Sequence, residues 1–204
     1  MRRMKESFAE DVEKAINQVV NIFQANPKRF WNKRDLLWIL FHYLNQQEIF
    51  QDKQATDFIR AEFPTRAMYQ AKKTARGHYD LAILQPESLA IPNVSGMAPW
   101  APWGEYLSLV KVSVAVELKM WLDRWSDMER VQWDIQKLTD AQNAVQHAYL
   151  LSFAQLDFSR PQMQEYYRKL RGFLIAQKKR SPNLKILCVP SDAAIQPETS
   201  ANWL

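Results

Sequence analysis

Three ionisable side chains stand in an order that suits the chemistry of a metal ion. Asp80 lies near the start of a short apolar segment, and Glu117 and Lys119 lie at the end of the next strong one. Alternate residues of a strand point to the same face, so Glu117 and Lys119 are expected on one side of it. Two carboxylates brought close together repel each other unless a cation lies between them. Hard oxygen ligands suit Mg²⁺ or Mn²⁺, and the sequence therefore predicts a divalent-metal site at Asp80 and Glu117.

An ammonium group two residues beyond one of these ligands adds a second chemical function. Lys119 can polarise a water molecule or stabilise negative charge that develops on a phosphate. Metal-assisted hydrolysis of a phosphodiester needs both a metal and such a group. The alternative reading of the same three residues is a solvated ion pair at the ends of two strands.

The segments that carry these residues are expected to pair in one sheet. Residues 79–84 are rich in apolar side chains, follow a turn signal at Gly77 and end before Pro86. Residues 112–119 form the strongest strand pattern, with valine at alternate positions 112, 114 and 116. If the two strands pair antiparallel, Asp80 and Glu117 meet.

The other elements predict an α/β protein with the order α-α-β-β-β-α-β-α-β. Apolar spacing predicts helices over about residues 7–24, 32–44, 126–144 and 161–178, the first capped by Ser7 and Glu10. Further strands are expected over residues 58–64, 148–153 and 184–189. This order favours a mixed sheet that starts as a meander and continues through crossover helices. We expect residues 51–204 to form this domain and residues 1–50 to form an N-terminal helical appendage.

The pattern Asp80 … Glu117-Leu118-Lys119, placed on strands and followed by a helix, resembles the PD-(D/E)XK nuclease superfamily over about residues 58–153. Two flanking segments resemble the family as well, namely the basic-Gly approach Arg76-Gly77-His78-Tyr79-Asp80 and the Asp-x-x-Lys-Leu helix that contains Asp134 and Lys137.

The resemblance implies a restriction-endonuclease-like fold, a mixed β-sheet flanked by helices, with two N-terminal helices added. It implies an endonuclease that hydrolyses DNA with Mg²⁺ or Mn²⁺. In that case Asp80 and Glu117 bind the metal, the Leu118 carbonyl assists, and Lys119 orients the attacking water. An extra acid is also implied, for which we favour Glu62 slightly over Glu48.

Accessory residues are expected beside this site. His78 shares the strand face of Asp80 and could touch phosphate or metal. Asp134 and Lys137 are spaced either for intrahelical ion pairs on a solvated face or for a supporting role near Lys119.

DNA as a partner is consistent with the charge of the chain. Its 204 residues carry a net charge of +5, which favours polyanionic partners, and its four glycines leave little material for a Gly-rich phosphate loop. Candidate phosphate contacts are Lys72, Lys73 and Arg76. Trp100 and Trp103, in a Pro-containing insertion, either form a hydrophobic cap or stack on bases. The tryptophans in or beside predicted elements are expected to pack there: Trp31, Trp38, Trp121, Trp125 and Trp133.

The sequence also predicts a cytoplasmic protein without a membrane partner. The single Cys188 lies in an apolar run and is expected to be a buried thiol. No signal peptide is visible, and the longest apolar run, residues 36–41, is too short to span a bilayer.

Two other function classes stay open. One is a catalytically inactive nuclease-fold protein that binds nucleic acid or acts as a subunit of a larger complex. The other is an interaction protein in which Trp100 and Trp103 form the interface. A homodimer is a further possibility, because cutting both strands of a duplex commonly uses two active sites.

Overall fold

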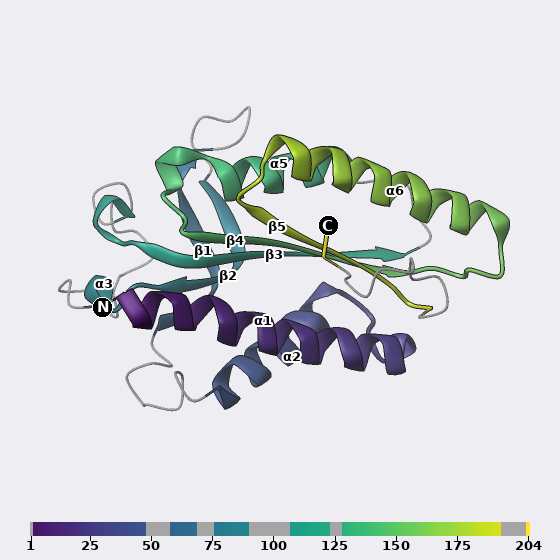
Figure 1. Cartoon of the computed structure of the whole chain (residues 1–204), viewed down its shortest axis with the longest axis horizontal. Coiled ribbons are helices and arrows are strands. Elements are labelled where there is room, and N and C mark those ends of the chain that lie inside the picture. The colour runs from purple at the N-terminus through teal and green to yellow at the C-terminus, as the bar shows by residue number, and fades with distance from the viewer. Residues whose placement is uncertain (1, 48–57, 69–75, 90–106, 123–127, 193–202) are drawn as a thin grey trace.

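Five strands form one mixed sheet in the order in which they occur along the chain (Figure 1). The structure, a computed structural model, describes residues 2–47, 58–68, 76–89, 107–122, 128–192 and 203–204. The first three strands, β1 (Ile59–Met68), β2 (Arg76–Leu84) and β3 (Val112–Leu122), pair antiparallel. The last two, β4 (His147–Gln155) and β5 (Leu184–Pro190), join β3 in parallel. The mixed α/β class and the expected meander are therefore confirmed.

Helices cover both faces of this sheet (Figure 1). The helices α5 (Met128–Thr139) and α6 (Pro161–Arg180) connect the parallel strands and pack on one face. The helices α1 (Arg2–Ala25) and α2 (Lys33–Gln46) pack on the other. Short helical turns are also present: η1 (Pro27–Arg29), α3 (Pro86–Leu89) and η4 (Ala141–Asn143). The expected order of the major helices and strands is confirmed.

The two leading helices bury their apolar faces directly against the sheet. Val12, Ile16 and Phe23 of α1 belong to the same buried cluster as Val114 and Val116 of β3. The domain boundary expected between residues 50 and 51 lies among residues 48–57, outside the described residues. Whatever its exact position, the leading helices share a core with the strands that carry the candidate site.

The expected cap of the first helix is wrong, and a different cap forms on the second. Helix α1 begins at Arg2, so Ser7 lies inside it, because the charged N-terminal residues are themselves good helix formers. On α2, Asn32 and Asp35 form the capping box: Asn32 Oδ1 accepts from Arg34 N, and Asp35 Oδ2 accepts from the Asn32 N–H. This cap fixes the first turn of α2, where Lys33 begins the helix.

Strand alternation divides the side chains of β3 between the two helical layers. Val114, Val116 and Leu118 lie in the cluster under α1 and α2, whereas Ala115 lies in the cluster under α5 and α6. Glu117 and Lys119 share the parity of Ala115 and therefore face α5. Cys188 is buried as expected, and burial raises the pKa of its thiol to about 11. Among the described residues, no helix is long and apolar enough to cross a membrane.

Candidate active site

Three acids stand at the same level on three neighbouring strands. The β1–β2 register pairs the residues on either side of Glu62 with those on either side of Asp80, so Glu62 lies opposite Asp80. The β2–β3 ladder pairs Leu81 with Val116. Continuing it by one residue on each strand brings Asp80 opposite Glu117. The antiparallel arrangement expected from the sequence thus places Glu62, Asp80 and Glu117 in one row.

The backbone departs from a regular ladder along this row. Glu62 has a φ of 51°, a left-handed conformation that is uncommon for a residue other than glycine and costs about 1–3 kcal/mol. On the other side of Asp80, the Leu118 N–H donates to Asp80 Oδ2 at 2.8 Å. The Asp80 carboxylate thus accepts a hydrogen bond that a neighbouring strand would otherwise accept. Backbone strain such as the positive φ of Glu62 occurs preferentially at functional sites.

The carboxylate of Asp80 is buried and receives a cation from the layer of α2. Lys33 Nζ lies 2.5 Å from Asp80 Oδ1. Burial acts to lower the pKa of Lys33, but its contact with Asp80 and the charges of Glu117 and Glu62 outweigh burial and raise that pKa. The Lys33 ammonium therefore binds Asp80, and the charges of the other two acids of the row favour its charged form.

The carboxylate of Glu117 is also buried and receives its cation from α5. Lys137 Nζ donates to Glu117 Oε1 at 2.6 Å. Burial raises the pKa of the Glu117 carboxyl well above its ordinary value, although Lys137 opposes this, and the charges of Asp80 and Asp134 raise the pKa further. Glu117 therefore resists ionisation more than an exposed glutamate does.

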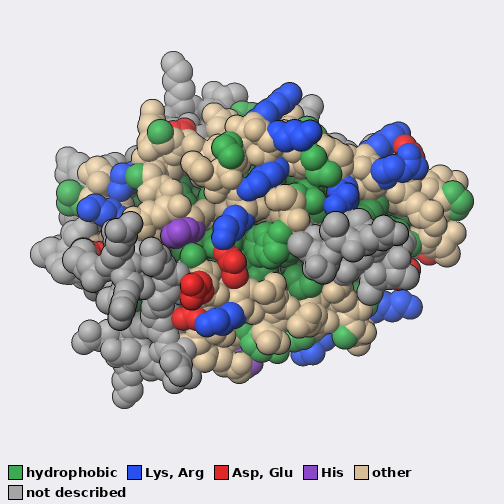
Figure 2. Space-filling model, viewed as in Figure 1, with side chains coloured by type: hydrophobic (Ala, Val, Ile, Leu, Met, Phe, Trp, Pro, Cys, Tyr) green, Lys and Arg blue, Asp and Glu red, His purple; other side chains and the backbone are tan. Residues whose placement is uncertain are grey.

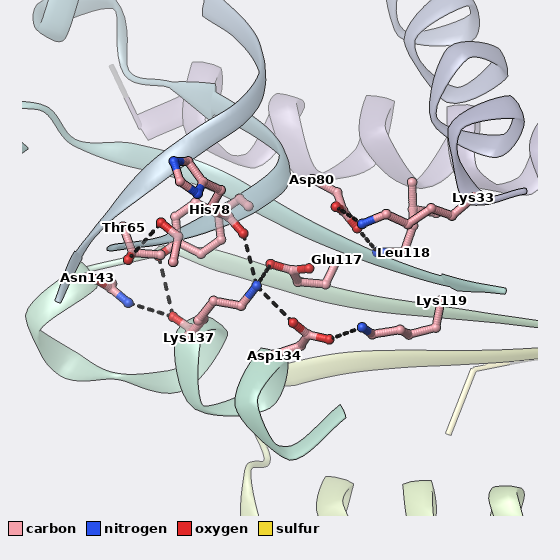
Figure 3. A network of polar contacts seen from close by, with 12 residues as sticks. Lys33, Thr65, His78, Asp80, Glu117, Leu118, Lys119, Asp134, Lys137 and Asn143 are labelled. Carbon is pink, nitrogen blue, oxygen red and sulfur yellow. Dashed lines mark hydrogen bonds and ion pairs between the residues drawn. The ribbon is translucent and has the colours of Figure 1, made fainter. Parts of the chain in front are cut away.

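A chain of charges connects Glu117 to Lys119 through α5 (Figure 3). Lys137 Nζ also lies 2.8 Å from Asp134 Oδ1 and donates to the His78 carbonyl at 2.9 Å. Asp134 Oδ2 lies 2.5 Å from Lys119 Nζ, an ion pair in which Oδ2 accepts no hydrogen bond from the described residues. Asp134 is buried and Lys137 partly so. The intrahelical ion pair expected between Asp134 and Lys137 is confirmed, but it lies on a largely buried face beside Lys119 instead of on a solvated one.

These residues line a pocket of about 440 Å³. Its wall contains four acidic and four basic side chains, the basic ones being Lys33, Lys119, Arg130 and Lys137 and the acidic ones Glu62, Asp80, Glu117 and Asp134. Gly77, His78 and Trp133 complete the lining. On one face of the molecule, acidic side chains lie together with Lys, Arg and His side chains beside exposed hydrophobic ones (Figure 2).

Comparison with protein-family models, curated proteins and solved structures found no significant match for this chain.

The donor set of the row fits a hard divalent cation. Its carboxylates are buried at Asp80 and Glu117, and a buried negative charge requires a positive partner. In the structure Lys33 and Lys137 supply that positive charge. The described residues contain no group of three or more His, Cys, Asp or Glu close enough together to hold a metal ion, so the fit of the row is one of donor chemistry alone.

The structure places the other sequence candidates as follows. Glu62 and His78 line the pocket. Arg76 begins β2, and its side chain is not described. Five candidates lie outside the described residues: Glu48, Lys72, Lys73, Trp100 and Trp103.

Sequence reasoning missed Lys33 and misassigned Trp133. Lys33 is separated from Asp80 by 47 residues, and only the capping signal Asn32–Asp35 marked its position at the start of a helix. Three of the tryptophans expected to pack are exposed instead, namely Trp31, Trp38 and Trp133, whereas Trp121 is buried as expected. Trp125 is outside the described residues.

Proposed function

We propose that this protein is a Mg²⁺- or Mn²⁺-dependent nuclease of the restriction-endonuclease-like fold that hydrolyses phosphodiester bonds in DNA. The observation that carries the proposal is the row Glu62–Asp80–Glu117 across three strands, with Lys119 in the same pocket. A meander followed by parallel strands with crossover helices supports the fold assignment.

Asp80 and Glu117, with the Leu118 carbonyl, would hold the metal. When bound, the cation supplies a water of lowered pKa and neutralises charge on the phosphate. Glu62 would add a further oxygen ligand or hold a metal-bound water, since it lies opposite Asp80. These roles use oxygen donors only, as the hard cation requires.

The lysines of the pocket would act on the substrate. Lys119 Nζ, held by Asp134, is placed to orient a water molecule or to donate to a phosphate oxygen. A divalent cation at Asp80 and Glu117 would replace Lys33 and Lys137 as their counter-charge. The Lys33 ammonium would then be available to the phosphate, while Lys137 would keep its contact with Asp134, so the pocket would bind the anionic substrate more strongly with metal than without it.

Cleavage by matched variants tests this proposal. Purified protein is incubated with Mg²⁺ or Mn²⁺ and with single-stranded, duplex or branched DNA, beside Asp80→Asn and Lys119→Ala. Each substitution should lower the cleavage rate by about 100-fold or more, because it removes a metal ligand or a charge-stabilising donor. Asp157→Asn and Lys28→Ala, which change exposed residues outside the pocket, should cleave as the parent does. Equal cleavage by all four variants would overturn the assignment.

One observation favours a second candidate, a nuclease-fold protein that binds nucleic acid or serves as a subunit without catalysis. The acids Asp80 and Glu117 already have ammonium partners from within the chain. Such a protein needs no divalent cation at these acids. Calorimetric titration with Mn²⁺ separates the candidates: the nuclease should bind the ion in the parent and lose binding in Asp80→Asn, whereas the non-catalytic protein should show no such difference.

A further inference from the structure

Trp133 stands partly exposed in the lining of the charged pocket. Its side chain is 48% exposed, although tryptophan has a large apolar surface that is usually buried. Trp121 shows the usual arrangement in the same fold: it is 4% exposed, and its Nε1 donates to Ser152 Oγ at 2.6 Å. Trp133 makes no ring contact with a described residue. Core packing therefore does not account for its position.

The position of Trp133 on α5 places it beside the pocket's cations. Arg130, Trp133 and Lys137 follow one another at steps of three and four, so they occupy neighbouring positions on one helix face. All three line the pocket, together with Lys119 on β3. An indole that shares a pocket with cationic side chains can bind a flat aromatic group whose neighbour along a chain is an anion.

A nucleotide in a single strand has this combination of groups. Its base presents a π-face for stacking, and its phosphate lies next to the base along the strand. In a duplex both faces of each base are already stacked on neighbouring pairs, so an indole reaches a base face only where the base is unpaired or flipped out.

We propose that Trp133 is a stacking platform for an unpaired nucleobase next to the phosphate that enters the pocket, with Arg130 as a contact to the adjoining backbone. The proposal rests on the proposed function for its choice of DNA as the ligand. It narrows the substrate to single-stranded DNA, or to duplex DNA with an unpaired nucleotide at the cleavage position.

Binding without cleavage tests the stacking directly. A labelled short single-stranded oligonucleotide is titrated in EDTA, and binding is followed by fluorescence anisotropy. Trp133→Ala should weaken binding by roughly 5- to 150-fold, which corresponds to the loss of one base–aromatic stack. Trp133→Phe should retain most of the affinity, because it keeps an aromatic face. Trp38→Ala should match the parent, since Trp38 is 71% exposed on α2 and does not line the pocket.

An abasic strand identifies the group that Trp133 contacts. The parent should bind an oligonucleotide with abasic positions more weakly than the intact strand. Trp133→Ala should bind both strands equally, because it has no stack to lose. Circular dichroism and thermal unfolding confirm that each variant is folded. The proposal is overturned if Trp133→Ala binds as tightly as the parent, if Trp38→Ala weakens binding equally, or if the parent does not bind single-stranded DNA.

The stacking proposal and the nuclease proposal can fail independently. If the parent cleaves no DNA but its binding depends on Trp133 and on the base, catalysis fails and the stacking platform stands. If the parent cleaves DNA while Trp133→Ala binds and cleaves as it does, the stacking platform fails and catalysis stands.

Discussion

Two of the buried acids of the pocket, Asp80 and Glu117, are each neutralised by a lysine from a different helix. Lys33 of α2 binds Asp80, and Lys137 of α5 binds Glu117. Removing one member of such a pair leaves a buried charge without a partner, which costs more than the pair itself contributes. A divalent cation can compete with the lysines for these acids, because it can replace an ammonium group without leaving the acid unpaired.

Lys33→Met should show this competition. In EDTA the variant should unfold more easily than the parent by about 1–3 kcal/mol, since Asp80 loses its hydrogen-bonded cation; the 45% exposure of Lys33 keeps the effect below that of a fully buried pair. Mg²⁺ should restore more stability to the variant than to the parent. Urea unfolding with and without Mg²⁺ measures both effects, with Lys28→Met as the exposed control. Equal stability of Lys33→Met and the parent in EDTA would contradict the role given to Lys33.

Glu117→Gln should change how stability depends on pH in EDTA. Burial raises the pKa of Glu117 in the folded protein above its ordinary value of 4.5. The folded state therefore binds this proton more tightly than the unfolded chain. The resulting stabilisation is full below the ordinary value and is lost as pH rises through the raised one. Relative to Glu117→Gln, the parent should thus become steadily less stable as pH rises above the ordinary value, as measured by urea unfolding. A stability difference that does not vary with pH would show that the pKa of Glu117 is not raised.

At the level of elements, pattern alone predicted the order of the major helices and strands and the pairing that brings Asp80 and Glu117 together. Both follow from local apolar periodicity and from the charged end of β3. No sequence signal predicted the positive φ of Glu62, because the residues around it include no glycine, the residue that normally marks this conformation. The approach of Lys33 depends on how α2 packs on the sheet, which is a contact between segments far apart in the sequence. The exposure of Trp133 likewise reflects tertiary packing that its helical spacing did not reveal.

Helix α1 should be part of the cooperative unit that carries the site. Ile16 is fully buried in the cluster that α1 shares with β3. Ile16→Ala should therefore lower the free energy of unfolding by about 2–5 kcal/mol and keep a single transition. Gln18→Ala, on the exposed side of α1, should stay close to the parent. Urea unfolding followed by circular dichroism and by tryptophan fluorescence makes the comparison. Two separate transitions in Ile16→Ala would instead indicate that the leading helices form an independent unit.

At the scale of the whole molecule, the pocket draws its charges from both helical layers. Asp80 is held from the side of α2, and Glu117 and Lys119 are held from the side of α5 (Figure 3). Movement of either layer would alter the charge balance of the row. Acids and bases are equal in number around the pocket, so the net charge of +5 resides elsewhere on the chain. We expect that excess to guide a polyanion toward the pocket.

Salt dependence distinguishes this electrostatic contribution from stacking. Each phosphate contact to a single strand adds about 0.7 to the steepness of the plot of log affinity against log salt concentration. If Lys72 and Lys73, which lie between β1 and β2 in the sequence, both contact phosphate, the double variant Lys72→Ala/Lys73→Ala should lower that steepness by roughly 1.4. Trp133→Ala should weaken binding at every salt concentration and leave the slope unchanged, because stacking releases no counterions. Anisotropy titrations of one oligonucleotide across a range of KCl concentrations measure both slopes. A double variant with the parent's slope would remove these two lysines from the interface, whereas a reduced slope in Trp133→Ala would mean that the indole acts by positioning a cation instead of by contacting a base.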